Sequence, residues 1–152
     1  MNLSELGIKA RAASVLLAKM NVETKNKALI ACAEALVKES NSILEANAKD
    51  VLIGREKGMN EGLVDRLMLT EERIKGIAEG LEQVAALDDP VGEVLDMKKR
   101  PNGLLIGKKR VPLGVVGMIY EARPNVTPDA FALCFKSGNA VILRGGSDAI
   151  NS

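Results

Sequence analysis

The stretch VVGMIYEARPNVTPDAFALCFKSGNAVILRGGS, residues 115–147, decides the fold. Its first apolar run, residues 115–120, is typical of a parallel strand covered on both faces. Residues 128–137 have a helical pattern that Gly138 is expected to end. The inward-facing positions of that helix are expected to be Ala130, Phe131, Leu133 and Cys134. Residues 140–143 form a second buried strand, so the order predicts a right-handed parallel βαβ unit.

Polar residues follow both strands. The first strand leads to Glu121, Arg123 and Asn125, and the second leads to Arg144, Gly145, Gly146 and Ser147. Because ligands collect at the carboxyl ends of strands in open α/β sheets, both clusters are expected at one rim. The glycines allow close backbone approach, and Ser147 with the N–H groups of a following helix predicts an anion site to which Arg144 adds a donor fork. A plain strand-to-helix turn explains the same residues, and no GxGxxG fingerprint supports a conventional Rossmann loop.

The first cluster has two interpretations. The amide of Asn125 is able to stabilise a developing oxyanion without carrying a charge. Glu121 and Arg123 are suited to recognition of a charged substrate, although a simple ion pair between them is the structural alternative.

The chain before residue 89 reads as helical. A stripe at helical spacing consists of Leu29, Cys32, Ala33, Leu36 and Val37. Ser42 and Glu45 have the spacing of a capping box, which predicts a helix that begins there and ends near Gly58. Thr70 followed by two glutamates predicts another helix start, and that helix is expected to end before Asp88.

Residues 94–99 and 104–111 predict a β-hairpin. The turn between them contains Asn102-Gly103, a pair in which both residues tolerate positive φ. The hairpin also carries Lys98, Lys99, Arg100, Lys108, Lys109 and Arg110. We interpret these residues as the solvated faces of an exposed ribbon rather than a nucleic-acid site, since the chain has a net charge of +1 and only 2% aromatic residues.

The composition is that of a soluble domain. The 152 residues are 47% apolar and 27% charged, and the apolar runs are too short for a membrane span or a signal peptide. Cys32 and Cys134 fit buried thiols of a reducing compartment, so a cytoplasmic location is expected. The chain has no histidine, which argues against a zinc site or another protein-built metal site.

The segment PLGVVGMIYEARPNVTPDAFALCFKSGNAVILRGGSDAINS resembles the gamma-glutamyl phosphate reductases, a family of the aldehyde dehydrogenase superfamily. The form IYEARPNVTPDA distinguishes this family from ordinary aldehyde dehydrogenases, which carry Pro-Trp-Asn there. The upstream segments ILEANAKD and LVDRLMLTEERI and the hairpin with its PNG turn are also similar. The resemblance covers the whole chain as about the first third of a family member, so an amino-terminal piece of a longer enzyme is expected.

The resemblance implies an aldehyde-dehydrogenase-like α/β fold with an incomplete Rossmann-like sheet. Residues 1–92 would be the helical part of the nucleotide-binding domain, residues 93–111 a hairpin arm that pairs subunits into at least a dimer, and residues 112–152 the first βαβ unit of the NADP-binding domain. The implied reaction is the NADPH-dependent reduction of L-glutamyl 5-phosphate to L-glutamate 5-semialdehyde with release of phosphate, the second step of proline biosynthesis from glutamate.

The resemblance also implies residue roles. Asn125 matches the asparagine that holds the oxyanion. Arg144 matches a lysine that contacts the adenosine ribose, and Ser147 stands where NAD-preferring members place a glutamate, which suits the 2′-phosphate of NADPH. Gly145 and Gly146 complete the cofactor-binding set, whereas Glu121 and Arg123 are candidates for substrate binding.

The family's catalytic cysteine lies downstream of these residues, and neither Cys32 nor Cys134 replaces it. The 152-residue chain alone is therefore expected to be inactive. Two alternatives remain: a general NAD-dependent aldehyde dehydrogenase, or a non-catalytic interaction module for the fragment itself.

Overall fold

The computed structural model describes residues 2–121 and 123–152, so Ala122 of the predicted IYEARPN signature lies outside the described residues. The fold is α/β. Its elements are α1 (Leu3–Leu17), α2 (Val22–Lys38), α3 (Ser40–Glu56), α4 (Glu61–Leu67), α5 (Glu71–Ala86), β1 (Val94–Lys99), β2 (Leu105–Lys109), β3 (Val115–Ile119), α6 (Val126–Lys136), β4 (Ala140–Arg144) and the 3-10 turn η1 (Ser147–Ala149). No helix within these described residues combines the length and the apolar character needed to cross a membrane.

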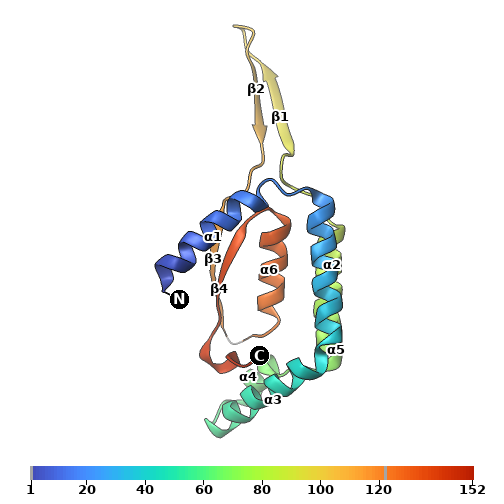
Figure 1. Cartoon of the computed structure of the whole chain (residues 1–152), viewed down its shortest axis with the longest axis vertical. Helices are drawn as coiled ribbons and strands as arrows, with labels where there is room; N and C mark the ends of the chain where they lie inside the picture. The colour runs from blue at the N-terminus through green and yellow to red at the C-terminus, as the bar shows by residue number, and fades with distance from the viewer. Residues whose placement is uncertain (1, 122) are drawn as a thin grey trace.

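The elements form layers around α6 (Figure 1). Helices α2 and α5 pack along each other, and α6 packs against both of them on one side and against β4 on the other. Helix α1 contacts β3 and β4, and α3 with α4 extends beyond the body where the chain also ends (Figure 1).

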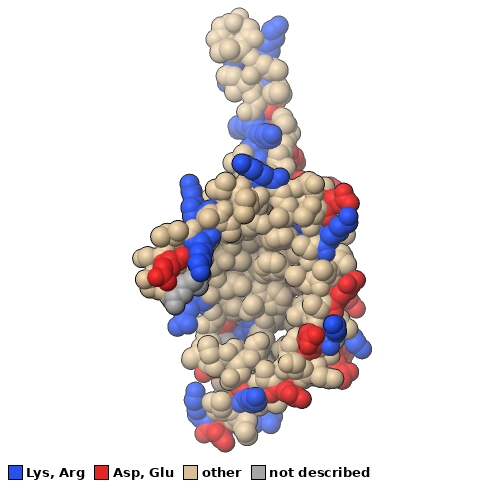
Figure 2. Space-filling model, viewed as in Figure 1, with Lys and Arg blue, Asp and Glu red and all other residues tan. Residues whose placement is uncertain are grey.

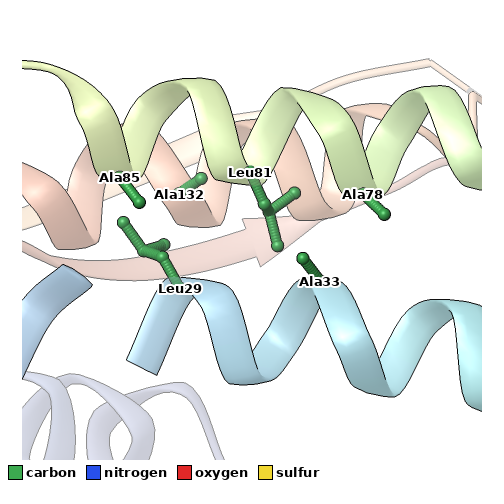
Figure 3. Close-up of a cluster of buried hydrophobic side chains, with 6 residues drawn as sticks. All are labelled: Leu29, Ala33, Ala78, Leu81, Ala85 and Ala132. Carbon is green, nitrogen blue, oxygen red and sulfur yellow. The ribbon is translucent and has the colours of Figure 1, made fainter. Parts of the chain in front are cut away.

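The main core lies where α2, α5 and α6 meet (Figure 3). Its fully buried members are Leu29, Ala33, Ala78, Leu81, Ala85 and Ala132. Alanine dominates the cluster, which lets the helix backbones approach closely around two leucines. The predicted stripe on α2 is right for Leu29 and Ala33, but Val37 is 43% exposed.

The helix starts follow the predictions only in part. Thr70 caps α5, and its side chain accepts a hydrogen bond from the Arg73 amide, as predicted. The predicted capping box at Ser42 is wrong, because α3 already begins at Ser40 and has no side-chain cap bond. Glu39 is both the C-cap residue of α2 and the N-cap residue of α3. Its backbone is therefore not in the extended conformation that the N-cap of a capping box requires.

The predicted hairpin is confirmed, with β1 and β2 pairing antiparallel. It projects away from the body (Figure 1). Of the Asn102-Gly103 pair in its turn, only Gly103 has positive φ, at +88°. The Gly103 amide donates to the Arg100 carbonyl at 2.9 Å. Pro101 and Asn102 therefore form the centre of an ordinary turn, and the glycine makes a bulge after it.

The predicted parallel pairing is also confirmed. Val115 pairs with Ala140 and Ile119 pairs with Arg144, in continuous register. The expected cover on both faces is absent from the described chain, since Ile119 is 86% exposed. Helix α6 ends at Lys136, and Gly138 follows its C-cap residue Ser137. At Gly138 φ is +75° and an added Cβ would lie 2.9 Å from Pro112, so only glycine fits.

Leu133 on α6 is an incorrect core prediction, because its side chain is 56% exposed. Ala132 is buried in the α2–α5 core, whereas Ala130 and Cys134 are buried on the opposite side of α6. A helix enclosed on two sides has two buried stripes, and Leu133 falls between them.

Candidate functional site

The two strand exits meet, as expected. The Tyr120 amide donates to the Arg144 carbonyl at 3.1 Å, which extends the β3–β4 ladder to the rim. The Tyr120 ring also packs on Gly145, where an added Cβ would lie 3.3 Å from it. The Tyr120 hydroxyl is hydrogen-bonded to Thr127 at 2.6 Å, so β3, β4 and the start of α6 are joined at this point.

Two cavities open at this rim. The first, here called the rim cavity, has a volume of about 370 Å³ and is lined by Met59, Leu63, Arg66, Leu67, Glu121, Arg123, Gly146, Ser147 and Asp148. The second, here called the asparagine cavity, has a volume of about 460 Å³ and is lined by Asp65, Arg66, Met68, Leu69, Arg73, Gly76, Ile77, Arg123, Asn125 and Asp129. Arg66 and Arg123 line both cavities, so the two are adjacent.

The structure brings most of the sequence-predicted site residues together. Glu121, Arg123, Gly146 and Ser147 line the rim cavity, and Asn125 lines the asparagine cavity. Arg144 lines neither cavity and its side chain is exposed. The close approach at Gly145 is to Tyr120 of the same chain, so this glycine is explained by internal packing.

The helix on whose N-terminus the predicted anion site depends is represented, within the described residues, by a short turn. The residues after Gly146 make a three-residue 3-10 turn, Ser147–Ala149, rather than an α-helix. So short an element has no appreciable dipole. The rim cavity therefore offers the hydroxyl of Ser147 and the guanidinium groups of Arg66 and Arg123 as its anion-binding groups.

The ion pair between Glu121 and Arg123, which was the structural alternative to a binding role, is not seen among the described residues. Within residues 2–121 and 123–152, the ion pairs join Lys25 to Asp89, Lys27 to Glu23, Arg73 to Asp65, Lys98 to Asp96 and Arg110 to Glu93. What joins Glu121 and Arg123 is a backbone hydrogen bond, with the Arg123 amide donating to the Glu121 carbonyl at 2.8 Å. Both charged side chains are exposed at the cavity edge.

Asn125 occupies the N-cap position of α6 without acting as a side-chain cap. Its backbone is helical, and its side chain makes no capping hydrogen bond. Partial burial raises the pKa of Asp129, one turn along the helix, and the nearby Asn125 amide opposes that rise. The Asn125 side chain itself lines the asparagine cavity.

Two buried polar residues on α3, missed by the sequence reasoning, bind chain segments that include or adjoin the lining of the rim cavity. Asn47 donates to the Leu67 carbonyl at 2.8 Å and accepts from the Leu69 amide at 2.7 Å. Asp50 accepts from the Asn151 amide at 3.1 Å and from the Ser152 hydroxyl at 2.6 Å. A signal was available: the two polar residues stand three apart within the quoted ILEANAKD segment, on one face of a helix.

Replacing Asp50 by asparagine should loosen residues 147–152. Burial raises the pKa of Asp50, but the hydrogen bonds from Ser152 and Asn151 outweigh it and lower the pKa overall. The neutral amide of the variant would lack the charge that these donors surround, at a cost of about 1.5–3 kcal/mol in the free energy of unfolding. The amides of residues 151 and 152 should exchange hydrogen faster in D50N, and Lys49→Gln on the exposed neighbour is the control. Unchanged exchange would show that Asp50 does not hold this segment.

The sign of the pH dependence follows from the lowered pKa of Asp50. The stabilisation from its hydrogen bonds is complete above its unfolded-state pKa and is lost as the pH falls through the folded-state value. The difference in stability between the natural protein and D50N should therefore shrink in acid.

Neither cysteine belongs to the site. Cys134 is buried in α6, and burial raises the pKa of its thiol. Cys32 packs against the main core. Neither residue lines the rim cavity or the asparagine cavity.

No family model matches the chain. The similar curated proteins, by contrast, carry the same name. The chain is 59% identical over 151 residues to the gamma-glutamyl phosphate reductase of Lachnospira eligens, covering 99% of this chain and 36% of that protein. It is 62% identical over 143 residues to the gamma-glutamyl phosphate reductase of Clostridium novyi, covering 94% of this chain and 34% of that protein.

Solved structures agree. The crystal structure of gamma-glutamyl phosphate reductase from Thermotoga maritima superposes with a TM-score of 0.95 at 48% identity, covering 99% of this chain and 36% of that one. The crystal structure of gamma-glutamyl phosphate reductase from Saccharomyces cerevisiae superposes with a TM-score of 0.93 at 34% identity, covering 99% of this chain and 39% of that one. The chain therefore spans about a third of the length of the curated relatives it matches.

Proposed function

Since this chain matches an amino-terminal portion of the gamma-glutamyl phosphate reductases in sequence and in fold, we propose that it supplies the NADPH-binding part of an enzyme that reduces L-glutamyl 5-phosphate to L-glutamate 5-semialdehyde and releases phosphate. The observation that carries the proposal is the position of Asn125: its amide lines a polar cavity directly beside the strand exits and makes no capping bond.

Asn125 is assigned the oxyanion of the acyl-transfer steps. A cysteine thiolate from outside these 152 residues attacks the C5 carbonyl of the acyl phosphate. The C–O bond to phosphate then breaks, and phosphate leaves with its electron pair. An amide N–H aimed at the C5 oxygen lowers the energy of the tetrahedral intermediate, because it stabilises the negative charge that develops there.

The donor types at the strand exits fit a dinucleotide phosphate. Arg144 presents an exposed guanidinium at the end of β4, and Ser147 presents a hydroxyl three residues later. These two residues would hold the 2′-phosphate, since a planar guanidinium donates two parallel hydrogen bonds to phosphate oxygens. NADPH supplies the hydride that converts the thioester to the aldehyde.

The chain's division into residues 1–92, 93–111 and 112–152 follows the same family pattern and stays a prediction.

Replacing Arg144 by alanine in the whole enzyme should weaken NADPH binding more than NADH binding. Loss of a charge-assisted bidentate contact should raise the Kd for NADPH about 10- to 100-fold. The Kd for NADH, which lacks the 2′-phosphate, should change by less than about threefold on the same grounds. Fluorescence titration of both nucleotides tests this, with Arg100→Ala in the hairpin as the control. Equal weakening for both nucleotides would remove the 2′-phosphate role.

A substrate panel tests the reaction itself. The whole protein that contains this chain is incubated with glutamate semialdehyde, phosphate and NADP, and separately with propanal and NAD. The proposal predicts turnover of the first mixture at a kcat/KM far above that of the second. A protein that oxidises propanal with NAD as efficiently would instead be a general aldehyde dehydrogenase.

The hairpin of β1 and β2 is proposed to pair subunits. It projects from the body, and its lysines and arginines are spread along it (Figure 2). Large apolar side chains are nevertheless exposed on it, namely Leu95, Met97, Leu104, Leu105 and Ile106, each at least 50% exposed. A two-stranded ribbon is marginal by itself, so a partner surface that covers these side chains accounts for it.

Replacing Leu95 and Leu105 together by lysine should convert the assembled enzyme to monomers. Two charges placed where apolar side chains are buried between subunits would oppose association, because neither charge has a partner there. Light scattering on the whole protein gives the mass. Leu113→Lys is the control, because Leu113 is 86% exposed and lies outside the hairpin. An unchanged assembly mass in the double variant would place the interface elsewhere.

A further inference from the structure

The asparagine cavity contains charges that the reaction chemistry described so far does not use. Asp65 and Arg73 neutralise each other, with 2.8 Å between the Asp65 Oδ1 and Arg73 Nη2 atoms. Arg73 also donates to the Met68 carbonyl at 2.7 Å. The cavity lining then retains one carboxylate, Asp129, and two guanidinium groups, Arg66 and Arg123, none of which takes part in an ion pair within the described residues.

The segment that carries Arg66 is held firmly. Asn47, which is 2% exposed, bonds the Leu67 carbonyl and the Leu69 amide on either side of Met68. Arg73 bonds the Asp65 and Met68 carbonyls from the other direction. The residues directly before and after Arg66 are thus fixed by side chains from α3 and α5. The backbone of Arg66, in the last turn of α4, is therefore held in place, which suits its guanidinium to selective recognition of a ligand.

The negative group is placed beside Asn125. Asp129 lies four residues further along α6, slightly more than one helical turn, or about 6 Å along the axis. Its pKa is raised by partial burial, and an ammonium group placed next to it would favour the charged carboxylate. A substrate whose reacting carbonyl lies at Asn125 therefore presents its other end to Asp129 and to the two arginines.

We propose that the asparagine cavity binds the amino-acid end of the substrate, with Asp129 accepting hydrogen bonds from the α-ammonium group and Arg66, together with Arg123, donating to the α-carboxylate. This inference rests on the proposed function. It assigns substrate recognition to Arg66 and Asp129, which the sequence reasoning did not single out. The opposite charges of a zwitterion match the opposite charges that line the cavity.

Two variants of the whole enzyme, each paired with an analogue, test the assignment. Asp129→Asn is assayed with glutamate semialdehyde and with 5-oxopentanoate, which lacks the amino group. Arg66→Ala is assayed with glutamate semialdehyde and with 4-aminobutanal, which lacks the carboxylate. Rates are referred to the open-chain aldehyde, since 4-amino aldehydes cyclise. In each case the ratio of the two kcat/KM values should fall about 10- to 100-fold, because the variant no longer recognises the missing group.

The controls are Glu79→Gln on α5 and Arg55→Ala on α3, exposed residues that line neither cavity. Arg66→Lys should restore part of the lost discrimination, since it returns the charge without the fork. Unchanged ratios would overturn the inference. So would an equal fall in kcat for all substrates in D129N, because that pattern means Asp129 only orients Asn125. A rise in the KM for phosphate in R66A with the ratio intact would assign Arg66 to the phosphate instead.

Failure of the proposed function looks different. In that case the unaltered enzyme itself would show no phosphate-dependent turnover of glutamate semialdehyde, whatever the variants do.

Discussion

Replacing Asn125 by alanine in the whole enzyme should lower kcat about 100- to 1,000-fold, the effect typical of removing one oxyanion donor. The KM for the aldehyde should change little, because the amide stabilises charge that develops only in the transition state. Steady-state kinetics in the phosphate-dependent direction measure both quantities.

The variant also separates catalysis from folding. The Asn125 side chain makes no capping hydrogen bond to α6, so N125A should unfold within about 0.5 kcal/mol of the natural protein. Val126→Ala, at the next position and outside both cavities, is the matched control. A kcat for N125A close to that of the control would contradict the role of Asn125 as oxyanion donor.

Replacing Lys25 by alanine should destabilise the chain by about 3–5 kcal/mol, the cost of breaking a buried ion pair from one side. Lys25 has no exposed side-chain area, and its Nζ lies 2.5 Å from the Asp89 carboxylate. The same Nζ donates to the Lys136 carbonyl at 2.9 Å, so it joins α2 to the end of α6. Alanine would leave a cavity, a partly buried Asp89 without its partner and an unsatisfied carbonyl.

Denaturant unfolding of the natural chain, K25A and K27A measures the effect. Lys27 is the matched control, because it lies on the same helix and forms an ion pair with Glu23 but is 76% exposed. K27A should cost less than about 0.5 kcal/mol, since exposed pairs of this spacing contribute little. Similar losses in K25A and K27A would contradict the account of a buried, structurally required pair.

The pH dependence of this difference has a defined sign. Burial raises the pKa of Asp89, but the hydrogen bonds from Lys25 and the Val91 amide, with the charge of Lys25, lower it overall. The stabilisation is therefore complete above the unfolded-state pKa of Asp89 and is lost as the pH falls through the folded-state value. The difference in the free energy of unfolding between the natural chain and K25A should therefore become smaller in acid.

The sequence predicted most elements because their signals are local. The hairpin, the parallel strands, the Thr70 cap and the stop at Gly138 each follow from a few adjacent residues. The errors arose where a local pattern met a tertiary constraint. Ser42 stands inside a helix that continues almost directly from α2, and Leu133 lies between two buried faces of α6. No single-helix pattern contains that information.

The same limit applies to the site. The strand exits could be located from the sequence because parallel strands end at one rim, and Glu121, Arg123, Gly146 and Ser147 do line one cavity. Arg66 and Asp129 could not be found this way, because α4 and α6 are distant in sequence and meet only in the folded chain. The buried pair of Lys25 and Asp89 is hidden for the same reason, since charged residues are normally expected at the surface.

The most direct test of the central claim is the dependence of NADPH formation on phosphate. The whole protein is supplied with glutamate semialdehyde and NADP, and the initial rate is followed while the phosphate concentration is raised from zero. The account predicts no appreciable rate without phosphate and a rate that saturates as phosphate is added, because phosphate must attack the thioester to release the product. NADPH formation that proceeds equally well without phosphate would mean that water releases the product, and it would contradict the acyl-phosphate reductase assignment.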